Sequence, residues 1–163
     1  MFSESFNLSK SSKYENSLST VISGSFRKHL PQISLLKKEL EQCCVSVLSP
    51  TGDLAINPDE EFIILNSDPV SHPKLLQDSV FAKIRQSTFL TVANVGGYLG
   101  KAAVLEIGYA IAIGISIYTL ESVEDPNLRP YCRPLQEIFP NLDYNLLEDD
   151  QSWQFNKVER IRN

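Results

Sequence analysis

Long hydrophobic runs are missing from this chain of 163 residues. Its longest apolar stretch, residues 107–117, is much shorter than the roughly 20 residues that a membrane-spanning helix needs. The first residues also lack the compact apolar run behind basic residues that is typical of a signal peptide. We therefore expect a cytoplasmic protein with no membrane partner.

Cysteine, histidine and basic charge are also scarce. The three cysteines, Cys43, Cys44 and Cys132, are too few and too unevenly spaced for a disulfide framework or a zinc site, so we expect reduced thiols. His29 and His72 fit no metal-ligand or nucleophile-activating pattern. We expect no metal and no cofactor. Because 15 Lys and Arg face 20 Asp and Glu, for a net charge of −5, we also expect no nucleic-acid partner.

What the chain does contain is the composition of one globular domain, with 42% hydrophobic residues and no internal repeat. Residues 1–18 are polar and serine-rich, which predicts an arm outside the fold. Residues 148–163 form a charged tail. The domain is therefore expected over residues 19–147.

Within this domain, strand patterns alternate with helix patterns. Short β-branched or apolar runs predict strands at residues 20–22, 44–48, 61–66, 88–93 and 115–120. Apolar spacing near 3.6 predicts helices at residues 30–40, 74–86 and 102–113, with a short one at 134–138. This alternation predicts a three-layer, doubly wound α/β domain with a mainly parallel sheet. Ligands of such sheets bind beyond the carboxyl ends of the strands.

Three loops are expected at that edge, over residues 23–29, over residues 94–101 and after Leu120, and the first two contain candidate motifs. The first, residues 23–27 (SGSFR), offers free N–H groups, hydroxyls and Arg27 for a phosphate or sugar hydroxyls, although it lacks the G-x-G-x-x-G dinucleotide spacing. Alternatively, Gly24 makes the turn and Ser25 caps a helix. The second, residues 94–100, is rich in glycine and suits either close approach to a ligand or a plain strand-to-helix turn.

Two carboxylates stand out in the helices beside these loops. Glu106 interrupts an otherwise apolar helix, and a buried carboxylate must be paired, hydrogen-bonded or protonated, which makes it a site candidate. Asp78 precedes it by 28 residues, which is enough chain to bring both side chains to one edge of the sheet. Two facing carboxylates suit glycosyl chemistry. The alternative is that either residue is a solvated helix charge.

Three short motifs occur in the order found in one enzyme family. They are VISGSFR at residues 21–27, QD at 77–78 and LEIGYA at 105–110. Together they resemble the nucleoside 2-deoxyribosyltransferase family, including its branch of 2′-deoxynucleoside 5′-monophosphate N-hydrolases. The similarity covers about residues 20–120.

This resemblance implies a flavodoxin-like domain that cleaves or transfers at the N-glycosidic bond of a 2′-deoxynucleoside or its 5′-monophosphate. Glu106 would be the nucleophile that forms a covalent deoxyribosyl intermediate, and Asp78 would assist departure of the base. Water as acceptor gives a hydrolase and a second base gives a transferase. Such enzymes are typically homodimers or higher homo-oligomers. The substrate-binding residues would be Ser23, Gly24, Ser25, Phe26, Arg27, Asn94, Gly97, Tyr98 and Gly100.

Two other interpretations stay open from the sequence. Gly96, Gly97 and Tyr98 with Glu106 faintly resemble the motif of lysine-decarboxylase-like phosphoribohydrolases. A module that binds and senses a nucleotide without turnover is also compatible with the fold. The pair Asp78 and Glu106 favours catalysis, because a sensor has no need of a carboxylate that repels a substrate phosphate.

Overall fold

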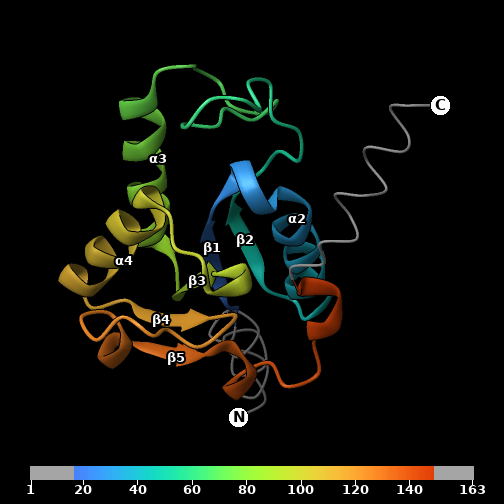
Figure 1. The fold of residues 1–163 in the computed structure, drawn as a ribbon, viewed down its shortest axis with the longest axis vertical. Helices are drawn as coiled ribbons and strands as arrows, with labels where there is room; N and C mark the ends of the chain where they lie inside the picture. The colour runs from blue at the N-terminus through green and yellow to red at the C-terminus, as the bar shows by residue number, and fades with distance from the viewer. Residues whose placement is uncertain (1–16, 149–163) are drawn as a thin grey trace, which may run out of the picture.

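The computed structural model describes residues 17–148 and contains one five-stranded sheet. All neighbouring strands run parallel, in the order β2-β1-β3-β4-β5 (Figure 1). This is a flavodoxin-like order, so the predicted α/β fold class is confirmed. The strands are β1 (Ser19–Gly24), β2 (Ser46–Ser49), β3 (Phe89–Ala93), β4 (Ser116–Thr119) and β5 (Cys132–Pro134).

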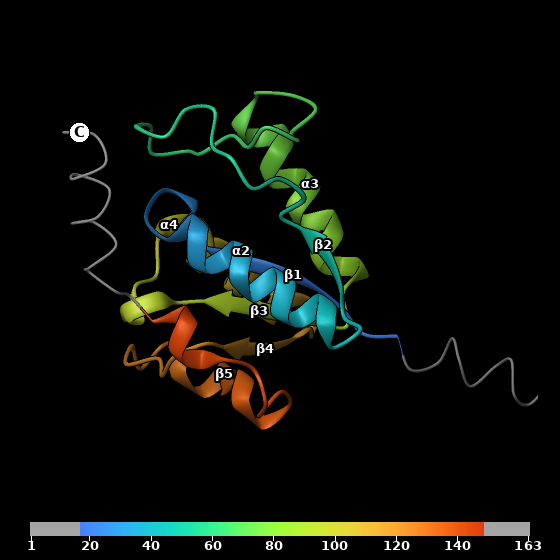
Figure 2. The same ribbon diagram turned by 90° about the vertical axis from the view of Figure 1, so that its right-hand side faces the viewer.

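Three α-helices cover the sheet: α2 (Phe26–Gln42), α3 (Pro73–Gln86) and α4 (Lys101–Ile113). α2 lies on one face, and α3 and α4 lie on the other (Figures 1 and 2). Successive residues of a strand point to opposite faces, so Ile22 joins the core under α2 while Val21 joins the core under α3 and α4. The short 3₁₀ helices are η1 (Val95–Gly97), η2 (Arg129–Tyr131), η3 (Leu135–Glu137) and η4 (Tyr144–Leu147).

The turn from β1 into α2 is shorter than the sequence predicts. The Ser25 hydroxyl accepts a hydrogen bond of 3.3 Å from the backbone N–H of Lys28, so the helix begins four residues before the predicted residue 30. The helix bends at His29, whose φ is −132°, two residues before Pro31. The helix therefore starts directly at the carboxyl end of β1.

The strand predicted at residues 61–66 does not form, and that prediction is wrong. Residues 50–72 form a loop instead. Among the residues that the structure describes, the loop's β-pairing consists of one isolated antiparallel bridge, between Ala55 and Leu65. The Asn57 side chain accepts from the backbone N–H of Ile64 at 2.7 Å and donates to the Phe62 carbonyl at 2.8 Å. These side-chain bonds occupy groups that a strand would pair with a neighbour.

β5, by contrast, is a strand that the sequence pattern did not predict. It is three residues long and ends at Pro134, which an edge strand tolerates because one side of its backbone needs no partner.

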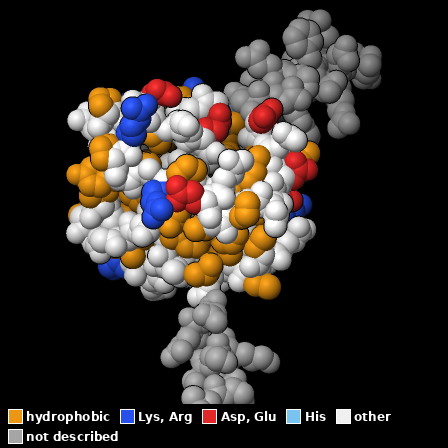
Figure 3. Space-filling model, turned by 90° about the horizontal axis from the view of Figure 1, so that it is seen from below, with side chains coloured by type: hydrophobic (Ala, Val, Ile, Leu, Met, Phe, Trp, Pro, Cys, Tyr) orange, Lys and Arg blue, Asp and Glu red, His pale blue; other side chains and the backbone are white. Residues whose placement is uncertain are grey.

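Figure 3 shows the molecule from below, the side on which β5 lies in Figure 1, with many hydrophobic side chains on the surface. Tyr131 and Ile138, on either side of β5 in the chain, are both exposed.

The elements from Ser19 to Leu147 form one domain. The predicted arm, residues 1–18, and the predicted tail, residues 148–163, lie outside the described residues except for residues 17, 18 and 148. Between residues 17 and 148, no helix combines the length and apolar character needed to cross a membrane.

Candidate active site

A cavity of about 390 Å³ lies at the carboxyl ends of β1 and β2. Its wall is formed by the β1–α2 turn, the end of β2, the loop over residues 50–72, and parts of α3 and α4. In Figure 1 this loop passes across the top of the molecule toward α3. The cavity therefore occupies the edge of the sheet where doubly wound folds bind ligands.

Three acidic side chains line this cavity, Glu61, Asp68 and Glu106, and only Glu106 among them is buried. Its residue is only 8% exposed, and burial raises the pKa of its carboxyl from 4.5 to about 7. The Gln77 amide, with Nε2 3.4 Å from Oε2, and the Ser23 hydroxyl act in the opposite direction by stabilising the charged form. At neutral pH both protonation states of this carboxyl are therefore populated.

Three distant segments meet around this carboxyl. Ser23 is the penultimate residue of β1, Gln77 lies in the first half of α3, and Glu106 lies in the middle of α4. Glu106 follows buried Ala103 by three residues and directly precedes buried Ile107, so it sits within the helix stripe that packs inward. The polar cluster thus depends on the packing of α3 and α4 against β1.

No protein-family model, curated protein or solved structure matches this chain. The chemical role of the site is therefore judged from its own residues. Within residues 17–148, no three His, Cys, Asp or Glu side chains are grouped so that they could hold a metal ion.

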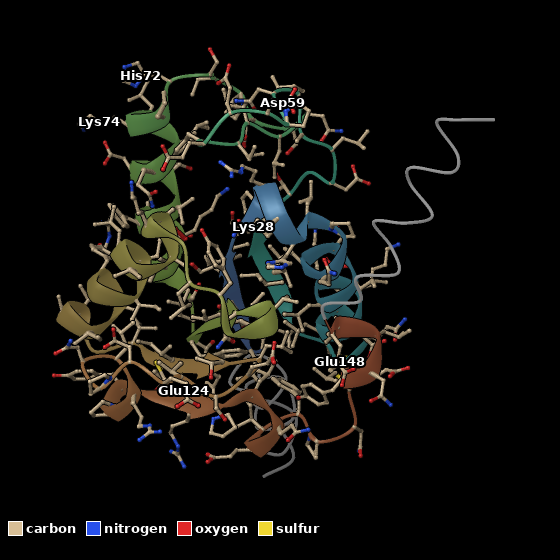
Figure 4. The ribbon with its side chains drawn as sticks, in the orientation of Figure 1. Lys28, Asp59, His72, Lys74, Glu124 and Glu148 are labelled. Atoms are coloured by element: carbon tan, nitrogen blue, oxygen red, sulfur yellow. The ribbon has the colours of Figure 1, made fainter. Side chains whose placement is uncertain are left out.

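Asp78, the second predicted catalytic residue, is not part of the cavity wall. Its Oδ2 lies 2.6 Å from Nζ of Lys74, and its side chain is 50% exposed. Lys74 lies on the outer side of the N-terminal end of α3 (Figure 4). Successive helix residues are turned by about 100°, so Gln77 and Asp78 cannot both face α4. The structure brings Gln77, rather than Asp78, next to Glu106.

Four of the five predicted binding residues of the first loop line the cavity, namely Gly24, Ser25, Phe26 and Arg27, whereas Ser23 lies outside its wall. A Cβ on Gly24 would lie 3.1 Å from the Ala93 carbonyl oxygen and 3.1 Å from a methyl carbon of Ile33, so glycine permits the close packing of β1 here. Arg27 forms no ion pair with an acidic side chain of the described residues. Its guanidinium is thus available to an anionic or carbonyl-bearing ligand.

The predicted binding residues of the second loop lie outside the cavity wall: Asn94, Gly97, Tyr98 and Gly100. Asn94 is buried and ties β3 to β4 by two hydrogen bonds with the Glu121 backbone, at 2.8 and 2.9 Å. The Tyr98 ring faces α2, with the Lys28 ammonium 3.7 Å from its centre. A role of this loop in substrate binding stays a prediction.

Sequence reasoning missed most of the cavity wall, including Phe62, Gln77 and Lys83. Gln77 directly follows buried Leu76, so the apolar spacing of α3 indicates that Gln77 lies next to the buried face of the helix. Phe62 was assigned to a strand that does not form. No pattern in the sequence indicated that its loop borders a cavity.

Proposed function

We propose that the cavity binds a 2′-deoxynucleoside or its 5′-monophosphate and that Glu106 cleaves the N-glycosidic bond. The observation that carries this proposal is a buried carboxyl on the cavity wall that has a pKa raised to about 7 and accepts a hydrogen bond from the neutral Gln77 amide. A carboxylate that is little solvated and faces a ligand is a suitable nucleophile for an anomeric carbon. The resemblance of residues 21–27, 77–78 and 105–110 to the deoxyribosyltransferase family supports the same chemistry.

The reaction has two displacements at C1′ of the sugar. First, a Glu106 oxygen bonds to C1′ as the C1′–N bond breaks, and the electron pair leaves with the base, which takes up a proton from solvent. Second, water or another base attacks C1′, loses a proton, and releases the Glu106 carboxylate. We expect deoxyribosides to react faster than ribosides, because a 2′-hydroxyl would crowd the approaching carboxylate.

We propose that Gln77 positions the Glu106 carboxylate and stabilises its charged form. Gln77 thus takes the supporting role that the sequence analysis gave to Asp78. Gln77→Leu is expected to raise the apparent pKa in the pH profile of kcat/KM and to lower the rate at pH 6 about 10-fold, because a hydrogen bond to the charged form is lost. Asp78→Asn, which removes an exposed ion pair, is expected to change the rate by less than about 2-fold. A severe loss in Asp78→Asn with a normal Gln77→Leu would restore the catalytic role of Asp78.

We also propose that the protein forms a homodimer through the outer face of α4. Val104, Leu105 and Ile113 are at least 40% exposed, and no charged residue follows Lys101 on the exposed side of this helix. A two-fold axis places one patch against its own copy, so an uncharged apolar face suits such contact. Ala102 is exposed and also lines the cavity, which places the proposed contact beside the site.

Leu105→Glu is expected to convert a dimer to a monomer, because the contact would bury two unpaired carboxylates. Light scattering coupled to size-exclusion chromatography measures the mass. Leu146→Glu is the matched control, since Leu146 is 55% exposed, like Leu105 at 54%, but lies on η4. A monomeric wild type, or a Leu105→Glu protein that stays dimeric, would refute this interface.

The experiment that tests the proposed function is a chromatographic screen for free base. The panel contains 2′-deoxynucleosides, their 5′-monophosphates and the matching ribosides, each with and without an added acceptor base. Release from deoxyribosides is expected, and its dependence on the acceptor separates transfer from hydrolysis. If no substrate releases base while a nucleotide raises the melting temperature, the enzyme proposal fails and the sensing module is favoured.

A further inference from the structure

Lys83 is a cavity residue that the proposed displacement does not use. It lies in the second half of α3, is partly buried, and lines the same cavity as Glu106. No acidic side chain of residues 17–148 forms an ion pair with it. Glu61, Asp68 and Glu106 line the same cavity, but none of them is within ion-pair distance of Lys83, so the partly buried ammonium is a candidate for contact with a ligand.

Lys83 and Gln77 lie on different sides of α3, although both line the cavity. Lys83 shares one helix face with Leu76 and Val80, at the spacing i, i+4 and i+7. Six residues separate it from Gln77, which corresponds to about 120° around the helix axis. Because Gln77 faces Glu106 on α4, Lys83 reaches the cavity from another side of α3.

That side of the cavity lies toward β2. α3 contacts β1, β2 and α4, whereas α4 contacts β1, β3 and β4, so α3 is the helix nearer the β2 edge of the sheet. Ser49 and Pro50, at the end of β2, contribute to the same wall. A helix side chain tilts toward the helix N-terminus, so the long Lys83 side chain is directed toward the carboxyl edge of the sheet.

The cavity wall combines apolar side chains with two further acidic ones, Glu61 and Asp68. Val80, Pro50, Phe62 and Leu65 all line the cavity, which suits a flat heterocycle better than a sugar. If the sugar C1′ lies at Glu106, the base extends away from that carboxylate into the rest of the cavity. The cavity wall has two cationic side chains, Arg27 from the β1–α2 turn and Lys83 from α3, and Lys83 is the one on the helix that also carries Gln77.

We infer that Lys83 selects the leaving base by donating a hydrogen bond to a ring carbonyl oxygen, so that the site takes oxo-purines or oxo-pyrimidines in preference to adenine. This inference rests on the proposed function for the position of the sugar. An ammonium has three donors and no acceptor, so it matches a carbonyl and opposes the exocyclic amino group of adenine. It also stabilises the negative charge that the base gains when the C1′–N bond breaks.

The test compares 2′-deoxyinosine with 2′-deoxyadenosine, whose bases differ at position 6 by a carbonyl against an amino group. Wild type is expected to favour deoxyinosine in kcat/KM by about 10- to 100-fold, the range of one charge-assisted hydrogen bond. Lys83→Met, which keeps the apolar stem, is expected to bring the two rates within about 3-fold. Lys38→Met is the matched control, because Lys38 is exposed on α2 and outside the cavity.

A second variant, Lys83→Gln, adds an acceptor at the same place. Its amide oxygen can accept from an amino group, so the preference is expected to move toward deoxyadenosine. Both compounds are also tested as 5′-monophosphates. If Lys83→Met impairs only the phosphorylated substrates, whatever the base, Lys83 binds phosphate and the inference is overturned. An unchanged base preference in Lys83→Met also overturns it.

Binding of the free bases separates this inference from the proposed function. Isothermal titration with hypoxanthine and adenine needs no turnover. If wild type releases no base but binds hypoxanthine more tightly than adenine, and Lys83→Met loses that difference, the enzyme proposal fails and the role of Lys83 stands. The role of Lys83 is refuted if wild type binds hypoxanthine and adenine equally well and cleaves 2′-deoxyinosine and 2′-deoxyadenosine at equal rates. It is also refuted if wild type binds neither base and cleaves neither nucleoside.

Discussion

Glu106→Ala is expected to lower base release from 2′-deoxynucleosides by at least about 10⁴-fold, the size of effect seen when a catalytic nucleophile is removed. The substitution removes the oxygen that we propose bonds to C1′, and the other residues of the cavity wall are unchanged. Glu106→Gln is expected to be nearly as inactive, because an amide is a poor nucleophile. The rate of free-base release under single-turnover conditions measures both losses.

Two controls make this result specific. Glu124→Ala removes a carboxylate that is 87% exposed and lies outside the cavity, and it is expected to leave the rate unchanged. Acid quenching followed by mass spectrometry is expected to find a deoxyribosyl adduct on wild type and none on Glu106→Ala. Turnover by Glu106→Ala at the wild-type rate would remove Glu106 from the mechanism.

Ionisation of buried Glu106 is expected to lower the free energy of unfolding. Between pH 4.5 and 7 the folded protein keeps a proton on Glu106 that the unfolded chain releases, so stability falls as pH rises through this window. Above pH 7 the full cost is present, about 3 kcal/mol. Glu106→Gln stays neutral at every pH and keeps a hydrogen-bonding group. We expect it to be about 3 kcal/mol more stable than wild type at pH 8, and less than about 1 kcal/mol more stable at pH 5.

Urea unfolding at the two pH values measures this difference. Glu124→Gln serves as the control, because an exposed carboxylate is solvated in both states, and its difference from wild type is expected to be the same at pH 5 and pH 8. If Glu106→Gln gains no more stability at pH 8 than at pH 5, the carboxyl titrates in its ordinary range. A more stable but inactive variant would show that the site trades stability for reactivity.

Local sequence patterns predicted the parts of the fold that depend on local physics. Apolar spacing predicted α3 and α4, and Glu106 was identified because one charge interrupts an apolar helix. The strand at residues 61–66 was predicted wrongly because apolar residues there resemble a strand, whereas Asn57 binds their backbone from within the loop. Which side chains satisfy a loop's backbone depends on its folded path, which periodicity does not encode.

The pair Gln77 and Asp78 shows a different limit. Buried Leu76 marks the inner face of α3, and Asp78 follows it by two residues, about 200° around the axis. The outward position of Asp78 was therefore readable from the helix phase. The family motif that residues 77–78 resemble predicts a catalytic carboxylate at Asp78 instead.

The loop over residues 50–72 forms part of the cavity wall but is not part of the five-stranded sheet. It leaves the sheet after β2 and returns at the start of α3, so a longer or shorter loop would leave the register of every parallel strand pair intact. Lengthening a surface loop adds only about 0.6 kcal/mol of closure entropy for each doubling. A change in the length of this loop is therefore expected to alter the shape of the cavity while the five-stranded sheet stays the same.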